Sequence, residues 1–369
     1  MIVSHTGWVD IGGHVKPGFE PVREVFAEVL AGQAGTGAAV AVWRDGEWVV
    51  DLWGGRVSAD GGRRWQADSL AQAYSAVKPF VAVCALLLAD RGQIDLDAPV
   101  QRYWPQFRAA ADVRQVLSHQ AGVVALDEPA PTEAFYDWDW LCALLAAQEP
   151  AWEPGTAHGE SALFYGHLVG ELVRRVDGRG LGRFLREEVC GPLGLDYFVG
   201  LTAAEQARAV ELTGLAEYFG PRVADRPDLG RRAVANPPGA FDAVVVNGPA
   251  WRAAEVPAIN GHATARGAAG LYAALLRGDL LSPALLREAV TAQCSGIDAV
   301  FGEQSAWGLG FGVDADGYGM GGSGGSYAGA SVAGGYAFAF ITGTMGSHAR
   351  ATAVENALRG CLGVAPLPD

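Results

Sequence analysis

Strand-like segments occupy both ends of this 369-residue chain, and mostly helical sequence lies between them. Near the N-terminus, two runs rich in Val, Ala and Trp flank Asp45-Gly46, a dipeptide typical of a tight hairpin turn. Near the other end, residues 305–343 hold several short runs of Gly, Ala and aromatic residues. Because a strand must bury its apolar face in a packed layer, this order predicts one α/β unit. Both ends of the chain would close this unit, and a helical insertion would separate its two halves.

Apolar residues recur at helical spacing in residues 19–33 and 346–360. The middle of the chain carries further helical patterns, at about residues 77–92, 112–119, 136–148, 162–176, 179–190, 263–277 and 282–293. The stretch from Gly220 to Pro257 is rich in Pro and Gly, and we expect it to be a long connecting loop.

Charge, hydropathy and cysteine content exclude several classes of partner. A net charge of −14 provides no basic surface for a phosphate backbone, so we expect no nucleic-acid partner. No run approaches the roughly 18 apolar residues of a membrane span, and residues 1–8 lack the features of a signal peptide. The five scattered cysteines form no C-x-x-C pair, which favours a reducing compartment. We therefore expect a cytoplasmic protein with no membrane partner.

The tetrapeptide Ser75-Ala-Val-Lys78 opens a long apolar run of helical length. Residues three apart on a helix share one face, with their Cβ atoms about 5–6 Å apart. A lysine amine at that spacing can reach the serine hydroxyl and act as its base, as in the S-x-x-K motif of penicillin-recognising serine enzymes. The simpler interpretation is a helix start in which Ser75 is the N-cap and Lys78 is solvated.

Six further sequence segments, on both sides of Ser75-x-x-Lys78, carry a recognisable pattern in one consistent order along the chain. They are Gly13–Phe19, Val49–Gly55, Asp90–Val100, Val116–Gly122, Glu153–Thr156 and Trp307–Phe311. With these blocks, the sequence resembles the class C β-lactamase-like serine hydrolases over nearly its whole length. The greatest similarity is to the family VIII carboxylesterases and related transacylases.

The resemblance implies an α/β fold with an antiparallel sheet, flanking helices and a large, mainly helical insertion. We expect an α/β domain of residues 1–72 and 262–369, and a mainly helical domain of residues 73–261. The active site would lie in the cleft between the two domains.

By the same resemblance, Ser75 is the nucleophile and Lys78 accepts its proton. The acyl group would pass through a covalent intermediate, which divides one difficult step into two easier ones. A free lysine has a pKa of about 10.4, so keeping it neutral near pH 7 requires roughly 4–5 kcal/mol. Burial at the start of an apolar helix is the right kind of perturbation.

The second catalytic element departs from the family pattern. Relatives carry a tyrosine after Pro-Gly-Thr, and aligning residues 154–167 places Glu160 at that position. Glu160 could act as a base or hold Lys78 charged, Tyr165 could substitute for the tyrosine after a loop shift, or Lys78 could act alone. A surface glutamate without a role is the fourth alternative. A carboxylate beside Lys78 would favour the ammonium form and weaken the lysine as a base.

The glycine-rich segment 318–326 supplies the third element. Met320 stands where relatives carry a cationic residue or histidine, while Gly321 and Gly322 allow a substrate to approach the backbone closely. The resemblance assigns an oxyanion hole to the backbone N–H groups of Ser75 and Ser323, which would stabilise a tetrahedral intermediate. The rival interpretation, a phosphate-binding loop, lacks the Gly-Lys-Ser/Thr motif and a following helix.

Several other residues have a functional and a structural interpretation. We expect Trp307 to line an acyl pocket and Tyr165, Met320, Gly321 and Gly322 to contact substrate. His119 lies in a family block and is interpreted as structural. His167 and Glu171, at i and i+4, are interpreted as a helix-surface pair rather than metal ligands. No histidine motif for zinc is present, so we expect no metal and no cofactor.

These elements predict an acyl-enzyme on Ser75 and, most simply, hydrolysis of a small-molecule ester or amide. The alternative is a transacylase that passes the acyl group to a second, nucleophilic substrate, as in antibiotic and other secondary-metabolite biosynthesis. A β-lactamase or DD-peptidase is disfavoured because the chain lacks Lys-Thr-Gly and an export signal. A non-catalytic acyl-binding protein is disfavoured because Ser75 and Lys78 are both present. The oligomeric state stays open.

Overall fold

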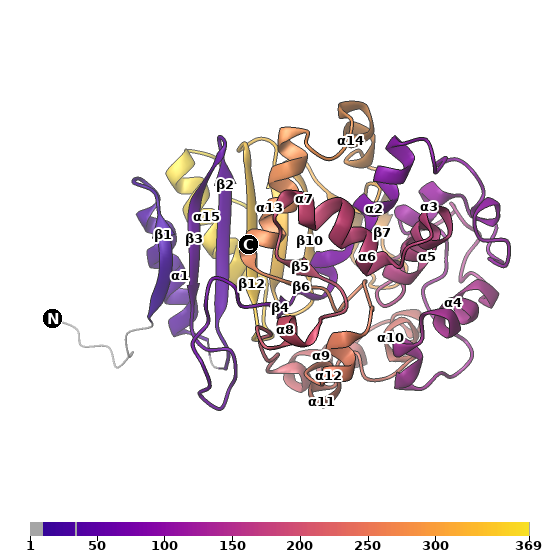
Figure 1. Ribbon diagram of the computed structural model, residues 1–369, viewed down its shortest axis with the longest axis horizontal. Coiled ribbons are helices and arrows are strands. Elements are labelled where there is room, and N and C mark those ends of the chain that lie inside the picture. Colours follow the sequence, from indigo (N-terminus) through magenta and orange to yellow (C-terminus); the bar gives the residue numbers. More distant parts are fainter. Residues whose placement is uncertain (1–9, 34, 369) are drawn as a thin grey trace.

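The computed structural model describes residues 10–33 and 35–368, and its largest element is a nine-stranded antiparallel sheet (Figure 1). The strands lie in the order β1-β3-β2-β12-β11-β10-β9-β8-β7. Their bounds are β1 (Ile11–Val15), β2 (Ala38–Arg44), β3 (Glu47–Gly54), β7 (Cys294–Ile297), β8 (Gln304–Trp307), β9 (Gly312–Val313), β10 (Gly317–Gly322), β11 (Ser326–Ser331) and β12 (Tyr336–Thr342). In the middle, β2 pairs with β12 from Ala38 opposite Thr342 to Arg44 opposite Tyr336. The predicted joining of both chain ends in one sheet is confirmed.

The hairpin between β2 and β3 turns at the predicted dipeptide. Asp45 and Gly46 have φ values of 49° and 90°, and the flanking Arg44 and Glu47 are paired. Both central residues therefore adopt the left-handed conformation that a two-residue hairpin turn requires, which Asp and Gly tolerate best.

Side chains of the central strands point alternately to the two faces of the sheet, and each face packs into its own hydrophobic core. Val40 and Val42 of β2 face α1 (Glu20–Ala31) and α15 (Ala349–Leu362), in a cluster that includes Phe26 and Phe338. Each such buried side chain contributes about 1.5–3 kcal/mol. On the opposite face, small residues such as Ala39 and Ala41 let α13 (Ala265–Arg277) pack closely against β2 and β12.

The middle of the chain is mainly helical. Its longer elements are α2 (Lys78–Asp90), α4 (Trp138–Ala147), α5 (Tyr165–Asp177) and α9 (Leu215–Ala224), and its shorter ones are η1 (Tyr74–Val77), η2 (Val100–Arg102), α3 (Val113–Leu117), η3 (Thr132–Tyr136), α6 (Leu181–Leu185), η4 (Arg186–Cys190), α7 (Gly191–Leu193), α8 (Ala203–Gln206), α10 (Asp228–Ala235), α11 (Ala243–Val246) and α12 (Pro249–Ala253). A three-stranded sheet of β4 (Ala71–Gln72), β6 (His262–Ala263) and β5 (Tyr197–Phe198) lies beside them, and α14 (Pro283–Ala289) follows α13. Within the described part of the chain, no helix is both long enough and apolar enough to cross a membrane.

The expectation of a long loop from Gly220 to Pro257 is wrong. Much of this stretch belongs to helices α9 to α12. Some of its Pro and Gly residues stand at helix boundaries, and one proline is accommodated inside a helix. Pro249 is the first residue of α12, where its missing N–H costs no hydrogen bond, and Pro221 lies inside α9. Asp242 caps α11 by accepting from the N–H groups of Val244 and Val245. Pro/Gly content therefore marked breaks between short helices here, not an absence of helices.

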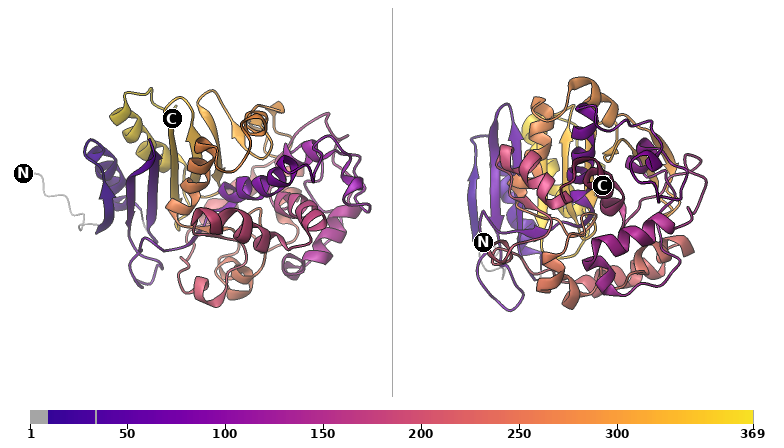
Figure 2. Two further views of the ribbon diagram at one scale, coloured as in Figure 1. Left: turned by 45° about the horizontal axis from the view of Figure 1, so that its top comes forward. Right: turned by 45° about the vertical axis from the view of Figure 1, so that its right-hand side comes forward.

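Helix α2 runs between the sheet and the helices of the insertion (Figure 2). It packs against α5 and α6, and residues 78–88 are all buried. Such all-round burial explains the continuous apolar run in the sequence, which has no polar face. The N-terminal end of α2 and the preceding turn η1 approach β10, so Ser75 and Lys78 lie where the two parts of the fold meet.

Candidate active site

The junction of η1 and α2 positions the Ser75-x-x-Lys78 pair. Ser75 is the second residue of the 3-10 turn, and Lys78 is the first residue of α2. Neither helix uses Ser75 as its N-cap, and the Lys78 side chain is only 1% exposed. The interpretation of a capping serine and a solvated lysine is therefore wrong. The preceding Tyr74 has a φ of 46°, a strained value for a non-glycine residue that is often found at functional sites.

Three side chains converge at this junction. The Lys78 Nζ atom donates to Ser75 Oγ at 2.6 Å, to Glu160 Oε1 at 2.8 Å and to the Ala162 carbonyl at 3.1 Å. Ser75 Oγ in turn donates to Glu160 Oε1 at 3.1 Å. A hydroxyl, an amine and a carboxylate thus form a closed triangle of hydrogen bonds. The structure brings Glu160 to the position that the alignment predicted, and a surface glutamate without contacts is excluded.

Asp298 fixes the Glu160 segment, and the sequence analysis missed it. Its Oδ2 atom accepts the Glu160 N–H at 2.8 Å, and its Oδ1 atom accepts the N–H groups of Val300 and Phe301. Burial raises the pKa of Asp298, which these hydrogen bonds partly oppose. The local bonds from Val300 and Phe301 form an Asx-type turn, but the bond to Glu160 spans 138 residues and has no sequence signal.

Burial and charge act in opposite directions on the lysine and the carboxylate. Burial lowers the pKa of Lys78, and the adjacent Glu160 carboxylate only partly offsets this effect. For Glu160, burial raises the pKa, but the charge of Lys78 and the hydrogen bonds from Lys78 and Ser75 outweigh it and keep the pKa below its usual value. Glu160 is therefore ionised near neutral pH, and Lys78 loses its proton at a lower pH than an exposed lysine does.

The end of β10 comes against the Ser75 turn. A Cβ atom on Gly322 would lie 2.0 Å from the Ala73 carbonyl oxygen and 3.2 Å from the Ala76 nitrogen, so only glycine fits. Ser323 follows directly and lines the same pocket as Ser75. The N–H of Ser75 lies in the first turn of a helix, where N–H groups lack intrahelical acceptors.

Two pockets adjoin at Glu160 and Gly321. The first, the acidic pocket, has a volume of about 400 Å³ and is lined by Glu160, Asp298, Phe301, Glu303, Gln304, Ser305, Ala306, Trp307, Gly312, Val313, Asp314, Gly319, Met320, Gly321 and Tyr327. The second, the arginine pocket, has a volume of about 390 Å³ and is lined by Tyr74, Ser75, Glu160, Ala162, Leu163, Tyr218, Arg222, Arg226, Val234, Phe241, Ile259, Phe301, Glu303, Gly321, Ser323, Ser347 and His348.

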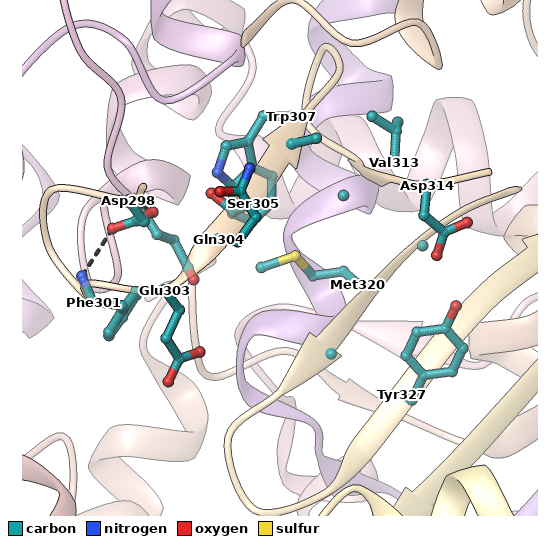
Figure 3. Close-up of a pocket in the computed structure, with 15 residues that line it drawn as sticks. Asp298, Phe301, Glu303, Gln304, Ser305, Trp307, Val313, Asp314, Met320 and Tyr327 are labelled. Atoms are coloured by element: carbon teal, nitrogen blue, oxygen red, sulfur yellow. Dashed lines mark hydrogen bonds between the residues drawn. The ribbon is translucent and has the colours of Figure 1, made fainter. Parts of the chain in front are cut away.

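Most of the predicted contact residues line these pockets. In Figure 3 the Met320 side chain projects into the acidic pocket, with Trp307 on one side and Tyr327 on the other. Tyr165 does not: its side chain is fully buried, its hydroxyl donates to the Leu117 carbonyl, and it lines neither pocket. The expectation that Tyr165 contacts substrate is therefore not met, because α5 directs this ring into the core.

Two histidines prove to be packing residues. His119 is buried, its Nδ1 atom accepts the Ser161 N–H, and burial lowers its pKa to about 3, so the ring stays neutral. The interpretation of His167 and Glu171 as a helix-surface pair is wrong, because both side chains are fully buried between α5 and α4. Glu171 accepts hydrogen bonds from Trp138 and from two arginines of α5, and His167 stacks on Trp138.

The sequence analysis also missed the arginines of the second pocket. Arg222 and Arg226 lie four residues apart, at the end of α9 and just beyond it. That spacing is a helical signal, but the segment had been interpreted as a connecting loop. The error in the fold thus concealed two residues of the site.

Comparisons with known proteins agree with this geometry. A family model described as Beta-lactamase matches residues 22–359. Esterase/beta-lactamase LipL of Mycobacterium tuberculosis is 36% identical over 303 residues, which cover 75% of this chain and 68% of that protein. A family VIII carboxylesterase structure matches with a TM-score of 0.86 and 35% identity, covering 95% of this chain and 100% of the other.

A penicillin-binding protein homolog from Caulobacter crescentus gives a TM-score of 0.84 at 32% identity, again covering 95% of this chain and 100% of the other. The resemblance that the sequence blocks carried is thus confirmed at the level of sequence and of fold. The chain belongs to the beta-lactamase family and is a β-lactamase-like serine hydrolase.

Proposed function

We propose that this protein hydrolyses small-molecule carboxylic esters through an acyl-enzyme on Ser75. The observation that carries the proposal is the 2.6 Å hydrogen bond between Ser75 Oγ and the buried Lys78 Nζ, at the edge of a pocket. The names of the relatives above, which include an esterase and a carboxylesterase, support ester substrates.

Lys78 serves as the proton carrier in this proposal. Burial lowers its pKa, which raises the fraction of neutral amine that can accept the Ser75 proton as Oγ attacks the ester carbonyl. The resulting ammonium then protonates the departing alkoxide, and the alcohol leaves. In the second half-reaction Lys78 takes a proton from water, the hydroxide attacks the acyl-enzyme, and the proton returns to Ser75 Oγ as the acid is released.

Glu160 stabilises the ammonium that forms on Lys78 during each attack. Its Oε1 atom lies 2.8 Å from Nζ, and its lowered pKa keeps it ionised over the working pH range. This resembles the carboxylate of a Ser-His-Asp triad, which stabilises the cation formed on the base without taking the proton. The backbone N–H groups of Ser75 and Ser323 would stabilise the oxyanion, each donor contributing about 2.7–4 kcal/mol.

Transacylation is a second candidate, and the paired pockets favour it. Because the acidic and arginine pockets adjoin at Glu160 and Gly321, a donor in one leaves room for an acceptor alcohol or amine in the other. A role in secondary-metabolite assembly stays a prediction from the sequence.

The test is covalent labelling of Ser75 with a fluorophosphonate probe, read by mass spectrometry, together with turnover of p-nitrophenyl butyrate. Ser75→Ala is the control and should abolish both signals. Absence of labelling and turnover in the native protein would refute the proposal. Addition of an amine acceptor measures the ratio of amide to acid, and an acid product alone would reject transacylation.

A further inference from the structure

The arginine pocket holds two cations beside the nucleophile. Arg222 of α9 and Arg226, in the turn before α10, line the same 390 Å³ cavity as Ser75. Their presence contrasts with a chain whose net charge is −14 and with the neighbouring acidic pocket, where the charged lining residues are all carboxylates. A cationic wall in an otherwise acidic protein attracts anions locally, since a cleft focuses the field of its own lining.

Arg226 is held in place but lacks polar partners. Its guanidinium carbon lies 4.4 Å above the centre of the Phe301 ring, and its Nη1 atom is buried with no hydrogen-bond partner among the described residues. Burial also lowers the pKa of Arg226, and the negative charges of Glu160 and Glu303 only partly oppose this effect. A buried unpaired donor costs stability, and such donors are normally satisfied.

Arg222, which is exposed at the rim of the arginine pocket, also stacks its guanidinium on an aromatic ring. Its guanidinium carbon lies 3.9 Å above the Tyr218 ring, and its Nη1 atom donates to the Tyr218 carbonyl at 3.0 Å. Stacking occupies the flat face of each guanidinium and leaves its N–H edge available. That edge matches the two oxygens of a carboxylate in bidentate fashion.

Two carboxylates also line this pocket, and they restrict where an anion can bind. Glu160 is already engaged by Lys78 and Ser75. Glu303 is exposed and lines the pocket together with Phe301. An incoming anion would therefore bind against the guanidinium groups of Arg222 and Arg226, while the ester carbonyl reaches Ser75.

We propose that Arg222 and Arg226 bind a carboxylate carried by the substrate, so that the preferred substrates are esters with a free acid group. This inference rests on the proposed ester hydrolysis and adds its substrate class. The carboxylate could belong to the acyl part, as in a dicarboxylic monoester, or to the leaving alcohol. The recognition chemistry is the same in both cases.

The test compares matched ester pairs that differ only in whether the acid is free. The acyl-side pair is mono-p-nitrophenyl glutarate and its methyl ester, and the alcohol-side pair is 3-acetoxybenzoate and its methyl ester. For at least one pair, we expect the native enzyme to favour the free acid in kcat/KM, and Arg226→Gln to lower that preference about tenfold or more, mainly through KM. Arg222→Gln should lower it less, because Arg222 is exposed. Arg183→Gln, which removes an arginine lining neither pocket, should leave the preference unchanged.

The inference would be overturned if the native enzyme, Arg226→Gln and the double variant Arg222→Gln/Arg226→Gln showed the same preference for the free acid in both substrate pairs. An arginine that only supports the Phe301 segment would change the melting temperature and not the preference.

A binding measurement separates this inference from the proposed hydrolysis. Glutaric acid monoanilide and its methyl ester are titrated calorimetrically into Ser75→Ala, which cannot turn over. Tighter binding of the free acid that is lost in Ser75→Ala/Arg226→Gln supports the carboxylate site even if ester turnover fails. Equal binding of acid and ester in Ser75→Ala would count against it even if esters are hydrolysed.

Discussion

The proposed roles, Lys78 as proton acceptor and Glu160 as the charge that stabilises its ammonium form, can be tested with Glu160→Gln. This substitution removes the charge of the side chain and keeps its shape. The carboxylate oxygen lies 2.8 Å from the lysine nitrogen. At that distance and an effective dielectric constant of about 20, the attraction is about 6 kcal/mol. A glutamine carbonyl keeps a hydrogen bond to the charged group worth about 1.5–3 kcal/mol, so the net loss is about 3–4.5 kcal/mol. Without the carboxylate, the pKa of Lys78 falls further below its usual value.

The sign of the pH effect follows from the direction of this shift. Glu160 raises the pKa of Lys78, and only the neutral lysine accepts the serine proton. Removing the carboxylate therefore extends activity to lower pH: the acid limb of kcat/KM should move to lower pH. The plateau should fall as well, because the ammonium formed in the transition state loses its partner.

The assay is the pH dependence of kcat/KM for p-nitrophenyl butyrate from pH 4 to pH 10, with stability followed in parallel. Glu303→Gln is the matched control, since it removes an exposed carboxylate of the same pockets that makes no bond to Lys78, and its acid limb should not move. Complete loss of labelling and turnover at every pH in a folded Glu160→Gln would mean that Glu160 itself is the base. An unchanged acid limb would mean that Lys78 does not titrate in that range.

Three further variants test other parts of the site. Lys78→Met should lower kcat about 10²–10⁴-fold and also lower the melting temperature, because it removes the base and leaves the buried Glu160 carboxylate without its cation; normal turnover in this variant would exclude Lys78 as the base. Gly322→Ala should lower both kcat and the melting temperature, since its Cβ would lie 2.0 Å from the Ala73 oxygen, and unchanged kinetics would show that β10 can move away from the Ser75 turn. Tyr165→Phe should keep ester turnover within about threefold and cost about 1 kcal/mol of unfolding free energy, measured by urea denaturation, because it removes only the bond to the Leu117 carbonyl; a loss of turnover comparable to that of Lys78→Met would return Tyr165 to the catalytic machinery.

The sequence predicted those parts of the fold that depend on local patterns. The Asp45-Gly46 turn, the apolar run of α2 and the strand segments at both ends carry their own periodicity or turn chemistry, and all three are confirmed. Helices α9 to α12 were missed because Pro and Gly residues lie both between them and, as with Pro221 of α9, inside them, a pattern typical of a loop.

The site could be predicted only where a local spacing or a family block contained it. The i, i+3 spacing pointed to Ser75 and Lys78, and the alignment pointed to Glu160. The bond from Glu160 to Asp298 and the pairing of Arg226 with the Phe301 ring join segments that are far apart in the chain. Such contacts depend on how the two parts of the fold close on each other, and no local pattern encodes them.

The pairing of β2 with β12 has a consequence for how the protein is made. The middle of the sheet joins residues 38–44 to residues 336–342, so this ladder can form only after almost the whole chain has left the ribosome. A nascent chain that ends near residue 300 already contains Ser75, Lys78 and Glu160, but lacks β10 and its glycines. Contacts so distant in sequence also slow folding, since a long loop must close before they form. The β10 segment that packs against the Ser75 turn is therefore added only when synthesis is nearly complete.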